Sequence, residues 1–225
     1  MLTFNILALV ILGYADASRA RKHHSAGCDL SGARLNVPAN QTQLIAPTYA
    51  PSYIGMGVGT QNYTCNTTLS TYTLVGAYGE IFDSSCLYGT SSFESASTVA
   101  SNVWYATTNV TVQQIVTILG LTHNSGVLGQ HYYVPNPVGS GLSPKWDFTS
   151  SGATAGDPNA YVIGAKVGDL PSANSSDIDD LMVEAVEGEL ASLVFRVDTD
   201  GGQPPAQCEA GNITVKYTAQ YWFFS

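Results

Sequence analysis

Short strand-like runs follow one another along most of the chain, and they restrict its fold class more than any other feature. Each run is rich in β-branched or aromatic residues and is bounded by residues that favour turns. The runs that predict strands are 54–65, 72–82, 129–135, 145–148, 161–166, 190–199 and 212–224. We therefore expect a mainly β fold, an antiparallel β-sandwich or flattened barrel with one or two short helices.

Two segments depart from this pattern. Residues 111–120 carry apolar side chains at helical spacing, and Thr111 with Gln114 matches the capping-box template, which predicts a short helix. Residues 178–187 fit both the helical and the strand periodicity, and the local pattern slightly favours a helix there.

The N-terminus has the pattern of an export signal. An apolar run from Leu2 to Tyr14 is long enough for a signal-peptide core and too short to cross a bilayer as a helix. The following Ala15-Asp16-Ala17 matches the small-x-small pattern of a cleavage site, so we expect residues 1–17 to be a signal peptide removed before Ser18. A cut after Ala20 is the alternative.

The composition agrees with export. Only 11% of the residues are charged, against about a quarter in a typical soluble protein. The net charge of −9 disfavours nucleic acid and anionic membranes as partners, and we expect no membrane span in the mature chain.

Residues 18–27 form a basic segment that we expect to be a flexible tail, and we expect residues 28–225 to be a single β-rich secreted domain.

Cysteines and glycosylation sequons fit the same compartment. The four cysteines lie far apart without C-x-x-C spacing, which argues against a zinc knuckle or a redox pair and for two disulfides in one of three pairings; they are Cys28, Cys65, Cys86 and Cys208. Six N-x-[ST] sequons predict N-glycosylation, at Asn40, Asn62, Asn66, Asn109, Asn174 and Asn212.

Five segments together carry a family resemblance: 57–65, 75–86, 129–133, 195–208 and 215–224. They resemble the family called domain of unknown function 3455, in its fungal secreted form. The resemblance implies a β-rich extracellular protein of unassigned biochemistry, a strand from Leu181 to Val186, and the disulfides Cys65–Cys208 and Cys28–Cys86.

Some members of this family carry a malate dehydrogenase label, which the residues do not support. The glycines Gly55, Gly57 and Gly59 superficially match a dinucleotide-binding pattern. However, they lie within a strand-like run, no helix follows, and no acidic residue closes a βαβ unit. We expect these glycines to serve packing.

Three residues form the candidate pocket: His131, Trp146 and Arg196. His131 is the only histidine in a strongly patterned strand, and with His123 it fits no standard metal-site spacing, so a hydrogen-bonded core histidine is the favoured interpretation. Arg196 lies beside Asp198 in an apolar strand, which predicts a structural ion pair, with an anionic ligand as the alternative. We assign no catalytic residue, no cofactor and no metal.

Two function hypotheses remain. The first is a non-enzymatic secreted glycoprotein at the cell wall or a host interface, whose partner is a wall polysaccharide or a host extracellular protein. The alternative is an extracellular carbohydrate-active hydrolase that uses strand carboxylates, among Glu80, Asp83, Asp147 and Asp198. Several aromatic residues could stack against sugars or pack in the core: Tyr132, Tyr133, Trp146, Tyr217, Tyr221 and Trp222.

Overall fold

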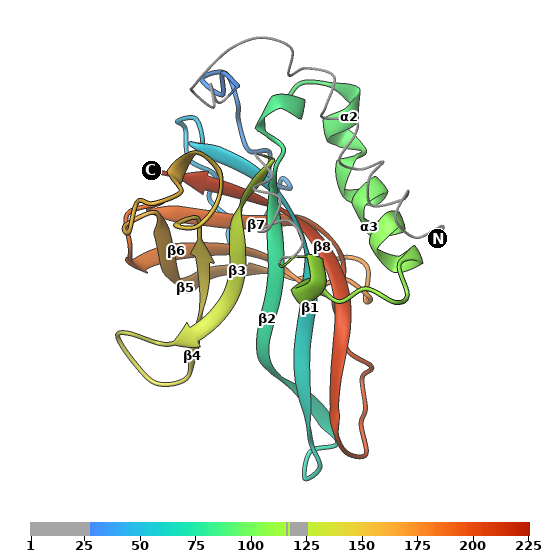
Figure 1. Ribbon diagram of the computed structural model, residues 1–225. Coiled ribbons are helices and arrows are strands. Elements are labelled where there is room, and N and C mark those ends of the chain that lie inside the picture. Colours follow the sequence, from blue (N-terminus) through green and yellow to red (C-terminus); the bar gives the residue numbers. More distant parts are fainter. Residues whose placement is uncertain (1–27, 116, 118–125) are drawn as a thin grey trace.

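The main feature of the computed structural model, which describes residues 28–115, 117 and 126–225, is a closed barrel of eight antiparallel strands (Figure 1). Each strand pairs with the next one along the chain, and β8 returns to pair with β1. The strands are β1 (Tyr53–Asn66), β2 (Thr71–Asp83), β3 (Val127–Pro135), β4 (Leu142–Asp147), β5 (Tyr161–Leu170), β6 (Asp180–Glu187), β7 (Leu193–Gly201) and β8 (Asn212–Phe224). The expected mainly β fold is confirmed, and all seven expected strand runs overlap strands.

The strand β6 corrects the helix that local periodicity favours over residues 178–187. This segment pairs with β5 on one side and with β7 on the other, so its backbone hydrogen bonds are made to neighbouring strands. Pairing also directs Val183 into the buried core of the barrel. Periodicity within one segment carries no information about such neighbours, whereas the family resemblance does imply a strand here.

The barrel interior is closely packed at the end where β1 begins. A Cβ atom on Gly57 would lie 2.4 Å from Cε2 of Tyr221, and one on Gly55 would lie 2.4 Å from Cγ2 of Ile81. The strand glycines therefore leave room for the rings and methyl groups of facing residues. This is the packing role that we expect from the sequence.

Two layers cover the outside of the barrel. Residues of the N-terminal segment, including Leu30 and Leu44, pack with Phe195 and Trp222 on the outer face of β7 and β8. The helix α3 (Ala96–Ala106) runs along β8, β1 and β7, preceded by the short helix α2 (Ser91–Glu94) (Figure 1). The 3-10 helices η2 (Ser85–Leu87) and η3 (Gly152–Thr154) lie in connections between strands.

A helical turn at 112–115 continues the second outer layer. Its start has the expected capping box: the Thr111 backbone N–H donates to Gln114 Oε1 at 2.8 Å, and the Gln114 N–H donates to Thr111 Oγ1 at 3.2 Å. Val112 and Ile115 pack with Trp104 of α3 over the outer face of β1 and β2. Beyond Ile115, most of the predicted helix lies outside the described residues.

Two disulfides tie segments to the barrel, Cys28–Cys86 and Cys65–Cys208. They are the pairs that the family resemblance implies. The predicted signal peptide, the predicted basic tail and His123 lie outside the described residues. In the described part of the chain, no helix is long and apolar enough to cross a membrane.

Candidate functional site

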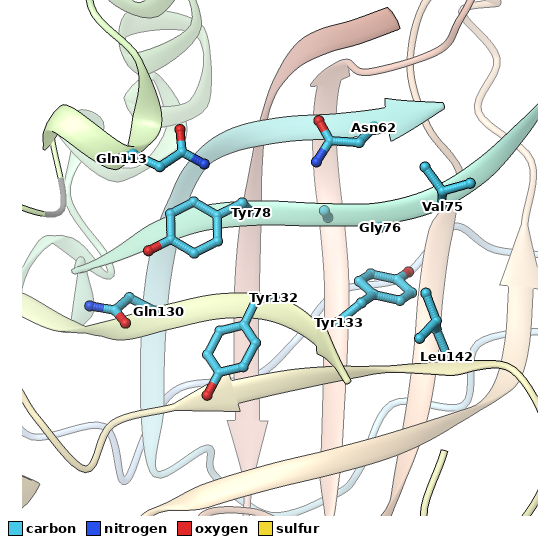
Figure 2. Close-up of a pocket in the computed structure, with 10 residues that line it drawn as sticks. Asn62, Val75, Gly76, Tyr78, Gln113, Gln130, Tyr132, Tyr133 and Leu142 are labelled. Carbon is cyan, nitrogen blue, oxygen red and sulfur yellow. The ribbon is translucent and has the colours of Figure 1, made fainter. Parts of the chain in front are cut away.

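An open groove lies where β2 and β3 separate. Their pairing ends at Tyr78 and Tyr132. The part of β2 that precedes Tyr78 pairs only with β1, and the part of β3 that follows Tyr132 pairs only with β4. The groove has a volume of about 530 Å³. Its lining residues, shown in Figure 2, are Asn62, Val75, Gly76, Ala77, Tyr78, Gln113, Gln130, Tyr132, Tyr133 and Leu142.

Neutral polar and aromatic side chains dominate this groove. The lining contains three tyrosines and three carboxamides, and none of the lining residues listed above carries a formal charge. The hydroxyl of Tyr132 donates a hydrogen bond to Asp147 Oδ2 at 2.7 Å, which fixes the position of the ring. On the opposite wall, Asn62 Oδ1 accepts a hydrogen bond from Thr214 Oγ1 at 3.1 Å.

The three candidate pocket residues gather inside the barrel, behind the groove wall. His131 stacks on Trp146, with ring centroids 4.7 Å apart and an interplanar angle of 17°. The ring of Tyr221 lies 5.7 Å from each of them, and Tyr221 is the cross-strand partner of Arg196. The structure therefore brings all three predicted residues around Tyr221.

His131 is a neutral side chain in this position. Burial lowers the pKa of its ring to about 3, and Nδ1 lies 3.0 Å from the Lys145 carbonyl oxygen. Because a neutral imidazole carries one proton, that contact places the proton on Nδ1 and leaves Nε2 as an acceptor.

Arg196 does not form the ion pair with Asp198 that the sequence predicts. Strand alternation directs Arg196 into the barrel, while the β-bulge between Val197 and Asp200 turns Asp198 outward. There Asp198 Oδ2 accepts hydrogen bonds from Ser97 and Gln220. The guanidinium instead donates to the Asp179 carbonyl oxygen, from Nε at 3.2 Å and from Nη2 at 2.7 Å.

Arg196 belongs to a group that we call the inner cluster, consisting of Tyr63, Tyr133, Arg196 and Tyr217. The four side chains are close enough to influence one another electrostatically. Burial raises the pKa of Tyr63 to about 12, and the positive charge of Arg196 opposes that shift. Tyr133 also lines the groove, so the inner cluster and the groove share a residue.

Two further donors inside the barrel have no hydrogen-bond partner among the residues that the structure describes. They are Nε2 of Gln61 and Nε1 of Trp146, both fully buried. Gln61 lies on the same face of β1 as Tyr63, two residues earlier, and its cross-strand partner Ala77 lines the groove. The interior next to the groove is thus rich in hydrogen-bond donors.

The strand carboxylates are distributed outside the groove. Asp83 Oδ1 accepts from the Ser85 backbone N–H, and Asp147 Oδ2 forms an ion pair with Lys145 at 2.9 Å. Glu80 is 1% exposed, and its Oε2 has no partner among the described residues. No group of three or more His, Cys, Asp or Glu residues in the described part of the chain could hold a metal ion.

The predicted aromatic residues divide between groove and core. Tyr132 and Tyr133 line the groove, whereas Tyr217 and Tyr221 are fully buried in the barrel and Trp222 packs in the outer layer. Sequence analysis missed Asn62, Tyr78, Gln113 and Gln130 as groove residues. The sequence marks Asn62 only as a sequon, and no local signal indicates that the part of β2 before Tyr78 separates from β3.

Comparison with models of protein families assigns the chain to a family. Residues 46–225 match the model of a protein family of unknown function, DUF3455. No curated protein and no solved structure is significantly similar to the chain. The match covers β1 to β8, the groove and the inner cluster, and the chain belongs to the DUF3455 family.

Proposed function

We propose that this chain is a secreted, non-enzymatic protein of the cell wall or of a host interface, and that it binds glycan in the groove between β2 and β3. The observation that carries the proposal is the lining of the groove by three tyrosines and three carboxamides. A surface of this kind suits a hydroxyl-rich ligand.

The chemistry of sugars supports this choice of ligand. The apolar faces of sugar rings pack against aromatic rings, and Tyr78 and Tyr132 are half-buried, so their rings keep surface for contact. Carboxamides both donate and accept hydrogen bonds, which matches sugar hydroxyl groups. Gln113 and Gln130 supply such groups from two different elements of the groove wall (Figure 2).

Export and glycosylation are part of the same proposal. Two disulfides suit an oxidising compartment. Of the sequon asparagines, Asn40, Asn109, Asn174 and Asn212 are exposed. Asn62 is half-buried in the groove and hydrogen-bonded to Thr214, so we expect that it carries no glycan and faces the ligand instead.

Binding to purified polysaccharides tests the proposal. The secreted chain is incubated with insoluble cellulose, chitin, β-1,3-glucan, xylan and pectin, and soluble oligosaccharides of any polymer that retains it are titrated by calorimetry. Tyr78→Ala is expected to weaken binding about tenfold, because a stacking face is lost. Tyr49→Ala removes an exposed tyrosine outside the groove and serves as the matched control.

Two outcomes would contradict the proposal. One is that no polysaccharide retains the chain. The other is that Tyr78→Ala and Tyr49→Ala bind equally well, which would place the binding surface elsewhere. Capture of a host extracellular protein with no affinity for glycans would favour the protein partner instead.

Hydrolysis of wall carbohydrate is a second candidate, and one observation favours it. Glu80 and Asp147 are both cross-strand partners of Gln130, which puts them on one face of the sheet, about 10 Å apart at two strand spacings. Burial raises the pKa of Glu80 to about 8. Burial also acts to raise the pKa of Asp147, but hydrogen bonds from Thr149, Lys145 and Tyr132 outweigh it and lower that pKa to about 2.

A pair of carboxyl groups with such different pKa values is typical of a general acid and its partner carboxylate. Neither carboxylate lines the groove, however, and Asp147 is already engaged by Lys145 and Tyr132. We therefore expect no release of reducing sugars from any polymer that the chain binds. Release that disappears in Glu80→Gln would establish the hydrolase in place of the binding protein.

A further inference from the structure

Arg196 is a buried cation without an ion pair. Its side chain is 8% exposed, and in the described part of the chain no carboxylate oxygen lies within 4.0 Å of its guanidinium. Its hydrogen bonds from Nε and Nη2 both end on one backbone carbonyl, that of Asp179. A guanidinium offers five N–H donors, so most of its capacity is unused.

The unused donors of Arg196 are buried but not completely enclosed. Gln61 Nε2 and Trp146 Nε1 are completely enclosed and have no partner in the described part of the chain, whereas no nitrogen of Arg196 belongs to that enclosed group. Nη1, which donates to no described residue, is therefore not one of the completely enclosed atoms. Lys166 is the other cation whose charge acts to lower the pKa of Tyr133. It is paired with Asp169 and is therefore not available to a ligand in the same way.

A second donor, on the inner face of β1, also lacks a partner among the described residues. Gln61 Nε2 is an orphan donor on the same face of β1 as Tyr63, and the hydroxyl of Tyr63 is already committed to the Gly202 carbonyl oxygen at 2.7 Å. Unpaired donors beside a cation are best satisfied by an anion with several acceptor lone pairs, and a carboxylate has about four.

One end of the groove adjoins this position. Tyr133 lines the groove and is also a member of the inner cluster, where it feels the charge of Arg196. Ala77, the small cross-strand partner of Gln61, lines the groove beside it. The end of the groove formed by Tyr133 and Ala77 therefore lies next to the inner cluster.

We infer that the glycan bound in the groove carries a carboxylate, as in a uronic acid, and that Arg196 binds this carboxylate. The inference rests on the proposed function and narrows its ligand class from sugars to acidic sugars. Arg196 is then a specificity-determining residue, while the tyrosines and carboxamides of the groove hold the sugar rings.

Charge limits the ligand to a short acidic segment. The chain has a net charge of −9, and Asp179 and Asp180 lie near Arg196 without pairing with it. A long polyanion would be repelled at a distance, whereas one carboxylate in contact with a desolvated guanidinium gains a short-range, charge-assisted interaction. The expected binding therefore concerns one carboxylate at one enclosed position.

The experiment compares one sugar with and without its charge. The full chain is titrated by calorimetry, at about 0.15 M salt, with a trimer of galacturonic acid, with the methyl ester of the same trimer, and with acetate. The acid is expected to bind about 10- to 100-fold more tightly than its ester, since a charge-assisted hydrogen bond is gained. Acetate, which lacks the rings, is expected to bind far more weakly than the acid trimer.

Variants of Arg196 assign the effect to this residue. Arg196→Gln is expected to reduce the affinity for the acid to that for the ester and to leave the affinity for the ester unchanged. Arg196→Lys is expected to keep part of the preference, because it keeps the charge but loses the planar fork. Arg34→Gln is the control, since Arg34 also donates to backbone carbonyls but is exposed and belongs neither to the groove lining nor to the inner cluster.

The outcomes separate this inference from the proposed function. Equal binding of acid and ester in the natural chain, with Tyr78→Ala weakening both, would overturn the inference and keep the glycan-binding groove. Binding of neither sugar would count against both. Tight binding of acetate alone would show a carboxylate site without a sugar site and would overturn the inference as stated. Thermal melts of the Arg196 variants verify that each one is folded.

Discussion

Glu80 and Arg196 are two buried ionisable residues that form no ion pair with any described residue, but they differ in whether they can become neutral. Glu80 is 1% exposed on the outer face of β2, beneath the layer formed by Trp104, Val112 and Ile115. Its pKa of about 8 means that it can give up its charge by taking a proton. Arg196 is 8% exposed inside the barrel and cannot lose its proton in a protein. Glu80 can therefore be buried as a neutral side chain without a partner. The charge of Arg196 remains, and an anion would balance it.

Glu80 gives the largest expected effect, in the dependence of stability on pH. Its folded pKa of about 8 lies above the ordinary value of 4.5, so its contribution is complete below pH 4.5 and is lost as the pH rises through 8. The full span corresponds to at most about 5 kcal/mol. Glu80→Gln, which cannot ionise, is expected to be more stable than the natural chain by several kcal/mol at pH 9 and nearly equal to it at pH 5. Urea unfolding at both pH values measures the difference.

An exposed glutamate provides the control for Glu80. Glu209→Gln removes a carboxylate from the surface and is expected to change stability about equally at pH 5 and pH 9. If Glu80→Gln showed the same small, pH-independent change as Glu209→Gln, Glu80 would be ionised in the folded protein. The contrast with Arg196 would then disappear.

The Tyr217–Tyr221 pair is an intermediate case, because two buried polar groups satisfy each other. Their hydroxyl oxygens lie 3.0 Å apart, and both residues are almost fully buried. Tyr221→Phe leaves the Tyr217 hydroxyl without this partner and is expected to cost about 1–2 kcal/mol. The double variant with Tyr217→Phe removes both hydroxyls and is expected to recover part of that loss. Additive losses in urea unfolding would show that the two hydroxyls do not depend on each other.

The sequence predicts much of the fold and little of the site, for a physical reason. Strands such as β8 are visible because alternation and turn residues are local, and the capping box of Thr111 and Gln114 is visible for the same reason. The sequence does not predict the helix α3, because its buried face includes Ser97 and Ser101, which interrupt the apolar stripe. The local pattern also could not decide between helix and strand for β6, because its strand conformation depends on pairing with β5 and β7.

The candidate site depends on contacts between distant strands. His131, Trp146 and Arg196 could be named from their residue types, but their gathering around Tyr221 follows from the register of β3, β4, β7 and β8. The ion pair predicted for Arg196 and Asp198 failed because a β-bulge, invisible in the residues, turns Asp198 outward. The groove arises from the separation of β2 and β3, which no local pattern encodes.

The capping box gives a smaller expected effect that sharpens the account of Glu80. Thr111→Ala removes the acceptor for the Gln114 N–H and is expected to cost about 1 kcal/mol. Because Val112 and Ile115 belong to the layer over Glu80, fraying of this turn would admit water and move the pKa of Glu80 down toward its ordinary value. NMR titration of the Glu80 side chain measures that shift. An unchanged pKa would mean that this turn does not keep water from the carboxyl group.

Arg196 gives the smallest expected effect on the stability of the chain without ligand. Arg196→Met loses two hydrogen bonds to the Asp179 carbonyl, but it also removes the cost of burying an unpaired cation. We expect these terms to offset each other to within about 0.5 kcal/mol in urea unfolding at pH 7. A loss above about 3 kcal/mol would assign Arg196 a structural role like that of a buried ion pair, and its presence would then need no ligand. A near-zero change together with loss of the preference for acidic sugar would separate binding from folding at this residue, which is the distinction that the comparison with Glu80 predicts.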